Sequence, residues 1–120
     1  MSDERIHDAP LLVACLCAQW CGTCRDYRAV FDALGAELGM RATFVWVDIE
    51  DDEEVLGAID IDDFPTLLIA QADRVLFFGP ITPQPQTLAR LVQSALGGDL
   101  KVVADAALDG LAARVRTSAD

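Results

Sequence analysis

The sequence is short of basic residues, has a single histidine and contains no long apolar run. Nine Lys and Arg stand against twenty Asp and Glu, and the net charge is −11. Such a chain is poorly suited to neutralise phosphates, which argues against nucleic-acid binding. No apolar segment approaches the roughly 20 residues of a membrane span. The one histidine, His7, lies in a polar lead-in, so we interpret it as a surface residue rather than a catalytic base.

Two further features are missing. The N-terminus is acidic and polar, without the cationic stretch and apolar run of a signal peptide, so we expect a cytoplasmic protein whose thiols are mostly kept reduced. The acidic segment 48–54 lacks the glycine and the glutamate that a calcium-binding loop needs at its sixth and twelfth positions. We interpret this segment as the polar opening of a helix after a strand.

The chain does contain two closely spaced cysteines, Cys21 and Cys24, between an apolar run and an amphipathic segment. The run Leu11–Leu16 is typical of a buried strand. The apolar residues that follow recur at helical spacing: Cys24, Tyr27, Phe31, Leu34 and Leu38. The first sulfur would therefore lie at a helix N-terminus, where unpaired N–H groups favour the thiolate, as would the nearby Arg25 and Arg28. Because a thiolate attacks disulfides, the motif predicts thiol–disulfide exchange.

The pattern of the whole chain predicts an α/β domain with a mixed four-stranded sheet and helices on both faces. The strand–helix–strand connection makes the first two strands parallel, and a short hairpin makes the last two antiparallel. We predict a domain over 1–98 and a helical extension over 99–120 that packs on it. The predicted strands are 11–17, 43–49, 66–70 and 74–78, and the predicted helices are 21–38, 52–59, a helix beginning at Thr82-Pro83, and 103–116.

From about Leu11 to Leu96, the chain resembles the thioredoxin superfamily. The resemblance rests on Trp-Cys-Gly-Thr-Cys at 20–24, Phe-Pro-Thr at 64–66, Gly79 after the hairpin and the order of the elements. It implies a thioredoxin-like fold with a redox-active disulfide between Cys21, the nucleophile, and Cys24, the resolving thiol. It also implies a cis proline facing the cysteines, at Pro65, with Phe64 and Trp20 shaping the substrate groove.

The sequence departs from the family pattern around the expected site. The lead-in is shorter than in thioredoxins proper, and the residues between the cysteines are Gly-Thr rather than Gly-Pro. Cys15 and Trp46 stand where the family has a buried Asp and a Lys, so the usual proton carrier is absent, and Ala29 replaces a kinking proline. Asp26 could substitute for the missing carboxylate, but we interpret it as a solvated helix side chain.

Cys15 and Cys17 lie on the same face of the first predicted strand. They are interpreted as small buried apolar residues, because free cysteine is among the most buried residue types. Two alternatives remain open. Cys17 could form an extra disulfide or take part in a redox relay, or all four cysteines could bind zinc or an iron–sulfur centre. The spacing is unusual for a metal site, so we expect none.

The sequence thus predicts a thioredoxin-like thiol–disulfide oxidoreductase that acts on protein or small-thiol disulfides in cell redox homeostasis. It would need no bound cofactor, would take electrons from an external reductase or thiol, and is expected to be a monomer. The alternative is a binding or assembly-chaperone module with the same fold and little turnover.

Overall fold

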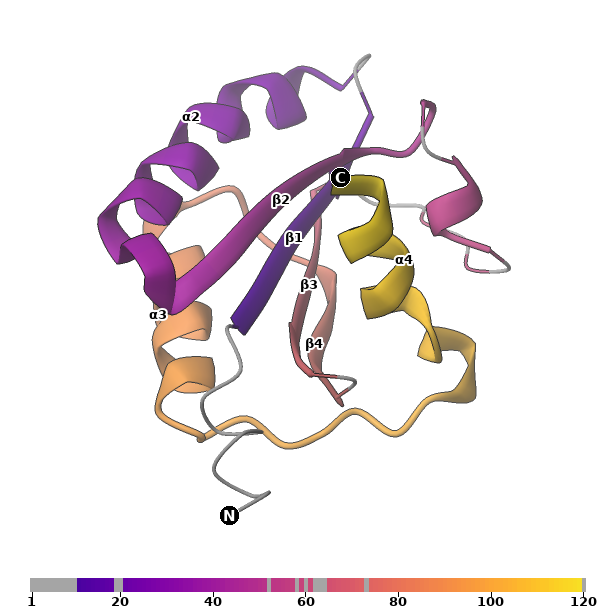
Figure 1. Cartoon of the computed structure of the whole chain (residues 1–120). Helices are drawn as coiled ribbons and strands as arrows, with labels where there is room; N and C mark the ends of the chain where they lie inside the picture. Colours follow the sequence, from indigo (N-terminus) through magenta and orange to yellow (C-terminus); the bar gives the residue numbers. More distant parts are fainter. Residues whose placement is uncertain are drawn as a thin grey trace.

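A computed structural model of the chain describes residues 11–18, 21–51, 53–57, 59, 61, 65–72 and 74–119 (Figure 1). The strands are β1 (Leu11–Cys17), β2 (Ala42–Asp48), β3 (Thr66–Gln71) and β4 (Arg74–Pro80). The α-helices are α2 (Gly22–Leu38), α3 (Pro85–Leu96) and α4 (Leu111–Ala119). The 3-10 turns are η1 (Gly39–Arg41), η2 (Glu53–Val55) and η3 (Ala106–Leu108).

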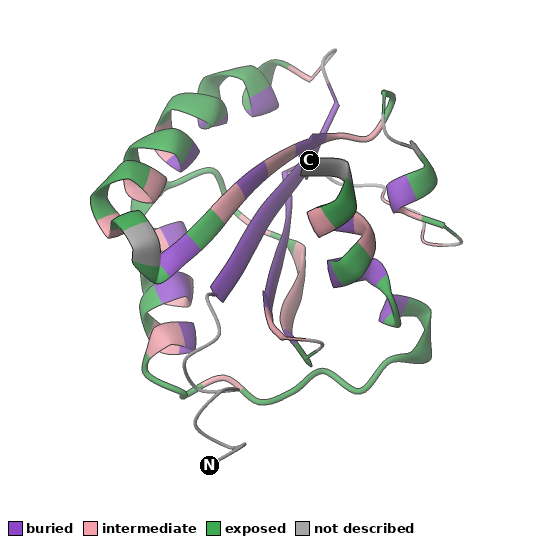
Figure 2. Cartoon of the chain, viewed as in Figure 1, coloured by how far each residue is buried: buried purple, intermediate pink, exposed green. Residues whose placement is uncertain are grey.

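The four strands form one mixed sheet in the order β2-β1-β3-β4. β1 pairs with β2 in parallel and with β3 in antiparallel orientation, and the β3–β4 hairpin is antiparallel. The predicted fold class and strand directions are therefore confirmed. Every residue of β1 is buried, because it has a strand on each side and helices over both faces (Figures 1 and 2).

Alternation along β1 divides the core into two layers. The odd-numbered residues, which include both of its cysteines, pack with α2 and α3, and the even-numbered residues pack with α4 on the opposite face (Figure 1). The first layer contains Leu11, Val13, Cys15 and Cys17, and the second contains Leu12, Ala14 and Leu16. Strand geometry therefore places the sulfurs of Cys15 and Cys17 on the side of α2.

α2 matches its predicted length closely and presents one buried stripe to the sheet, made of Cys24, Tyr27 and Phe31. It ends as predicted at Gly39, where φ is +58° and the backbone N–H donates to the carbonyl of Gly35. Glycine adopts this left-handed conformation without steric cost, so it terminates the helix.

Two of the predicted helices differ from the observed structure in their starting residue or in their length. Within the described part of 52–59, the regular structure is the 3-10 turn η2, followed by Gly57 at φ +60°. α3 begins at Pro85 with Gln84 as its N-cap, two residues later than the predicted Thr82-Pro83 start. The Thr82 hydroxyl lies 2.9 Å from that of Thr87, so it pairs with a side chain instead of capping the helix.

The predicted helix at 103–116 is split. Residues 101–105 are irregular, η3 follows, and α4 begins only after Gly110, whose φ is +80°. The left-handed glycine breaks the helical path that the apolar spacing suggested. α4 buries Leu111 and Val115 completely against the second core layer.

A hydrogen bond from one arginine side chain connects α4 to the segment after β2. The Arg114 Nε donates to the Val55 carbonyl at 2.7 Å, across 59 residues of sequence. The division into 1–98 and 99–120 stays a prediction, although α4 packs on the same sheet. None of the helices in the described part of the chain has the length and apolar character needed to cross a membrane.

Candidate redox site

Cys21 is the N-cap residue of α2, and its backbone is extended. Its N–H donates to the Ala18 carbonyl at 3.1 Å, and its own carbonyl accepts from Arg25 N–H at 3.2 Å. These two bonds hold the residue between the end of β1 and the first turn of the helix. Its thiol is free and half-buried, at the end of the helix where backbone N–H groups favour negative charge.

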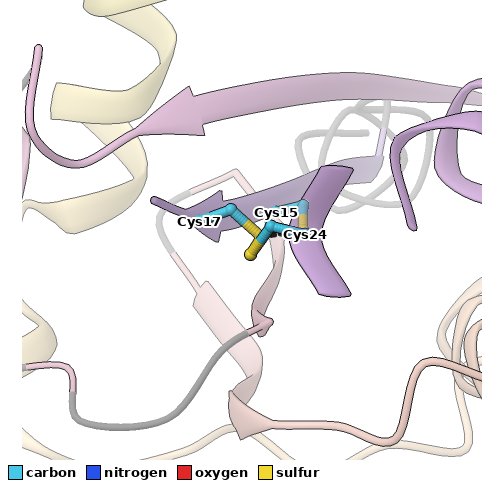
Figure 3. The surroundings of a disulfide bond; sticks show 3 residues. All are labelled: Cys15, Cys17 and Cys24. Carbon is cyan, nitrogen blue, oxygen red and sulfur yellow. Dashed lines mark hydrogen bonds between the residues drawn. A yellow bond between two sulfur atoms is a disulfide. The ribbon is translucent and has the colours of Figure 1, made fainter. Parts of the chain in front are cut away.

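Cys24 lies one turn further along α2 and is 1% exposed. It is bonded to Cys17, the last residue of β1, with a Cα–Cα distance of 5.8 Å (Figure 3). This separation is usual for a disulfide. The reason is geometric: alternation turns Cys17 toward α2, and the helical period turns Cys24 toward the sheet.

The observed pairing differs from the predicted one and corrects the interpretation of Cys17 as a small apolar residue. The predicted disulfide joined Cys21 to Cys24, whereas the structure joins Cys17 to Cys24 and leaves Cys21 as a thiol. Cys17 is therefore not merely a small apolar residue, and the alternative of an extra disulfide holds for it. The two pairings share the Cys24 sulfur, so they exclude each other in one molecule. A Cys21–Cys24 disulfide stays a prediction for another state of the chain.

Cys15 is a fully buried free thiol next to this disulfide, with its Sγ 3.5 Å from the Cys17 Sγ (Figure 3). Burial raises the pKa of the Cys15 thiol to about 12, against the opposing effect of the Arg28 charge. Cys15 therefore remains protonated at neutral pH and cannot replace the buried Asp of the family as a proton acceptor. Among the described residues, no group of three or more His, Cys, Asp or Glu side chains is arranged to hold a metal ion.

Tyr27 lies on the same buried stripe of α2, and its hydroxyl has no hydrogen-bond partner among the residues that the structure describes. Burial, and then the neighbouring Cys15, raise the pKa of the Tyr27 hydroxyl above its usual value. An unpaired buried hydroxyl costs about 1–3 kcal/mol.

Replacing Tyr27 by phenylalanine should therefore raise the free energy of unfolding by about 1 kcal/mol at pH 7. The difference should widen above pH 10. In that pH range the tyrosine of the unfolded chain loses its proton, while Tyr27 of the folded chain keeps it. The free energy of unfolding of the wild type therefore falls as the pH rises, whereas that of Tyr27→Phe does not change for this reason. Urea unfolding at pH 7, 9 and 11 measures both effects. A less stable variant at pH 7, or a difference that does not change with pH, contradicts this prediction.

A cleft of about 270 Å³ leads to Cys24 from the side of β2. It is lined by Ala18, Cys24, Arg25, Arg28, Trp46 and Asp48. The Arg28 guanidinium lies 5.0 Å from the centre of the Trp46 ring and 3.4 Å from an Asp32 oxygen. The Trp46 indole thus forms a wall of the cleft, with the Arg28 cation held against it.

Among the described residues that line this cleft, Asp48 carries the one carboxylate. It is the register partner of Cys17 on β2. Because it lies two residues after Trp46 on the same strand, both side chains are on the same face of the sheet, which is the α2 side. Its Oδ1 accepts the Glu50 N–H at 2.9 Å, which fixes the side chain. Sequence reasoning placed Asp48 in an acidic helix start, although its two-residue spacing from Trp46 was a usable signal. Asp26, the carboxylate considered from sequence, is exposed on α2 and does not line the cleft.

Pro65 is buried and immediately precedes β3, where its carbonyl accepts the Ile81 N–H at 3.1 Å. Leu16 pairs with Thr66, so continuing the register by one residue brings Pro65 beside Cys17. Pro65 therefore lies at the same end of the sheet as the cysteines. Its cis conformation stays a prediction. Trp20, Phe64 and His7 lie outside the described residues.

Comparison with known proteins points to one family. The family model described as thioredoxin matches residues 2–91. The thioredoxin of Bacillus subtilis (strain 168) is 30% identical over 59 residues, which are 49% of this chain and 57% of that protein. The chain spans a little over half the length of the curated relatives it matches.

Solved structures agree in fold. The thioredoxin of Trypanosoma brucei brucei superposes with a TM-score of 0.65 at 22% identity, over 80% of this chain and 83% of that one. The germline-specific thioredoxin Deadhead of Drosophila melanogaster gives the same TM-score at 19% identity, over 78% and 88% of the two chains. At these identities, the structural likeness establishes the fold alone.

Proposed function

Because the chain belongs to the thioredoxin family, we propose that it is a thiol–disulfide oxidoreductase that uses Cys21 as nucleophile and Cys24 as resolving thiol. Its substrates are disulfides of proteins or of small thiols. The observation that carries this proposal is the position of Cys21. It is a free thiol at the N-terminus of a 17-residue helix, one turn before a cysteine that already forms a disulfide.

The reaction begins from the fully reduced chain. The Cys21 thiolate attacks one sulfur of the substrate disulfide, a mixed disulfide forms, and the other substrate sulfur leaves as a thiolate. Cys24 then loses its proton and attacks the Cys21 Sγ, which forms the Cys21–Cys24 disulfide and releases the second substrate sulfur. Two electrons pass to the substrate, and an external reductase or thiol returns them to the chain.

Substrate contacts are proposed for Trp20, Phe64 and Pro65. An extended peptide would pair with the backbone beside Pro65, where a strand begins at the end of the sheet that carries the cysteines. A cytoplasmic location, a monomeric state and a role in cell redox homeostasis belong to the same proposal.

The proposal is tested by insulin reduction with dithiothreitol as electron donor. The chain should accelerate precipitation of the insulin B chain well above the rate with dithiothreitol alone. If there is no acceleration while Cys21 of the same sample reacts with N-ethylmaleimide, the chain is not a disulfide reductase. A binding or assembly module would then be the better assignment.

Asp48 is proposed to accept the Cys24 proton, because both residues line the same cleft. The substitution Asp48→Asn keeps an oxygen that can accept the Glu50 N–H but removes the base. We expect the resolving step to slow by about a hundredfold at pH 7. In a single-turnover reaction, the mixed disulfide on Cys21 should accumulate.

The matched control is Asp26→Asn, which makes the same change of charge on an exposed position of α2 outside the cleft. It should resolve the mixed disulfide at the wild-type rate. Equal rates in all three proteins would remove Asp48 from the mechanism.

A further inference from the structure

Three sulfur atoms meet between the end of β1 and the first turn of α2, and the proposed cycle uses only one of them. Cys24 is bonded to Cys17, and Cys15 lies 3.5 Å from Cys17 (Figure 3). Cys15 and Cys17 are 0% and 1% exposed, so bulk solvent does not reach them directly. Cys24 therefore has two candidate cysteine partners: Cys21, three residues before it at the start of the helix, and Cys17, to which it is bonded on the strand.

We propose that Cys17 is a second resolving cysteine, which takes over the disulfide from Cys21 and returns Cys21 to the thiol form. This inference rests on the proposed function, since it begins from the Cys21–Cys24 disulfide. In the added step, the Cys17 thiolate attacks the Cys24 Sγ, the Cys17–Cys24 bond forms, and the Cys21–Cys24 bond breaks. Cys21 leaves as a thiolate, the proton given up by Cys17 is finally released to solvent, and no net oxidation occurs.

The contrast in environment gives the step its direction. Cys21 lies at the N-terminus of α2 and is only partly buried, so a thiolate that leaves there faces the positive end of the helix dipole and can be solvated. Cys17 and Cys24 are both buried among apolar side chains, which suits an uncharged disulfide better than a thiolate. The exchange thus moves the charge outward to Cys21 and leaves the neutral bond in the core.

This transfer of the disulfide from Cys21 to Cys17, which we call the relay, changes the reactivity of the oxidised chain. With Cys17 bonded to Cys24, Cys21 is again a half-buried free thiol that can attack another disulfide. Because Cys24 is occupied, that mixed disulfide is not resolved, so the oxidised chain acts as a monothiol. Cys15 keeps its proton at neutral pH and serves as the control position for this cluster.

The experiment follows each thiol after oxidation. Reduced chain receives one equivalent of diamide, samples are quenched in acid denaturant at successive times, and free thiols are labelled with N-ethylmaleimide. The disulfide is then reduced and its thiols are labelled with iodoacetamide. No Lys or Arg lies between Arg5 and Arg25, so all four cysteines fall in one tryptic peptide, and fragmentation assigns each label.

In the wild-type chain, Cys21 should lose its N-ethylmaleimide label first and then regain it, while Cys17 and Cys24 become the iodoacetamide-labelled pair. In Cys17→Ala, Cys21 should stay oxidised with Cys24. Cys15→Ala should behave as wild type. If Cys17→Ala does not fold, Cys17→Ser replaces it, and the wild-type time course decides the question by itself.

A Cys21–Cys24 disulfide that persists in wild type, with Cys17 always free, overturns the relay. So does a Cys17–Cys24 disulfide that forms without earlier loss of the Cys21 label. Neither result depends on insulin reduction. If the chain reduces insulin but forms only the Cys21–Cys24 disulfide, the relay is wrong and the proposed function stands. If the chain does not reduce insulin, the proposed function is wrong.

Discussion

Replacing Cys21 by serine is expected to lower the rate of insulin reduction by at least about a thousandfold, because covalent attack then has no thiolate at the N-terminus of α2. The remaining thiols cannot compensate. Cys15 is buried and stays protonated at neutral pH, and Cys17 and Cys24 are each only 1% exposed. The measurement is the initial rate of insulin precipitation with dithiothreitol, after the rate of dithiothreitol alone has been subtracted.

The matched control is Cys15→Ala, which removes a buried sulfur close to the site but leaves Cys21 and Cys24 in place. Its rate should stay within a small factor of the wild-type rate. If Cys21→Ser keeps most of the activity, or if Cys15→Ala loses as much activity as Cys21→Ser, then Cys21 is not the nucleophile.

Replacing Phe31 by alanine is expected to lower the free energy of unfolding by about 3–5 kcal/mol. Phe31 is 1% exposed, and its ring centre lies 4.9 Å from that of Phe44 and 5.7 Å from that of Trp46. It therefore joins the middle of α2 to the edge strand β2, and truncation leaves a cavity between them. Such a loss is a large part of the roughly 5–15 kcal/mol by which small domains are stable.

Urea unfolding of the oxidised chain measures this effect. Glu37→Ala on the exposed side of the same helix serves as the control, and it should change the stability by less than about 0.5 kcal/mol. If Phe31→Ala costs no more than Glu37→Ala, α2 is not anchored to the sheet through this ring cluster.

The sequence was sufficient for those parts of the fold that depend on repeating patterns. The uninterrupted apolar run of β1 predicted a strand buried on both faces, and the spacing of Cys24, Tyr27 and Phe31 predicted the buried stripe of α2. Such periodicity reports burial directly, because the side chains of strands and helices repeat at fixed intervals. The predicted helix 21–38 likewise ends at the same residue as α2.

The failures fall where local signals compete with tertiary contacts. Thr82 has the residue type of an N-cap, yet its hydroxyl pairs with Thr87 and α3 begins later. The apolar spacing of the last segment continued across Gly110, which in fact adopts a left-handed conformation and separates η3 from α4. Helical periodicity indicates which face is buried, but it does not show where a glycine interrupts the helix.

The disulfide pairing could not be decided from spacing. Cys21 and Cys24 are close in sequence, so they are an obvious pair, whereas Cys17 and Cys24 meet only because β1 and α2 pack face to face. The alternation of side chains along the predicted strand did place Cys15 and Cys17 on the same face of the sheet. It could not show that Cys24 lies directly above Cys17, because that depends on how α2 sits on the sheet. Asp48 lines the same cleft because side chains alternate along β2 and because the register between β1 and β2 pairs Asp48 with Cys17.

The intact mass of the Cys24→Ser chain after reaction with insulin tests most directly whether Cys21 attacks disulfides. Without the resolving thiol, the first step should stop at the mixed disulfide. We predict one covalently attached insulin chain per molecule, linked to Cys21, released by dithiothreitol, and absent from the Cys21→Ser/Cys24→Ser double variant. A Cys24→Ser chain that stays unmodified, or one modified at Cys15 or Cys17 instead, would contradict the proposed function.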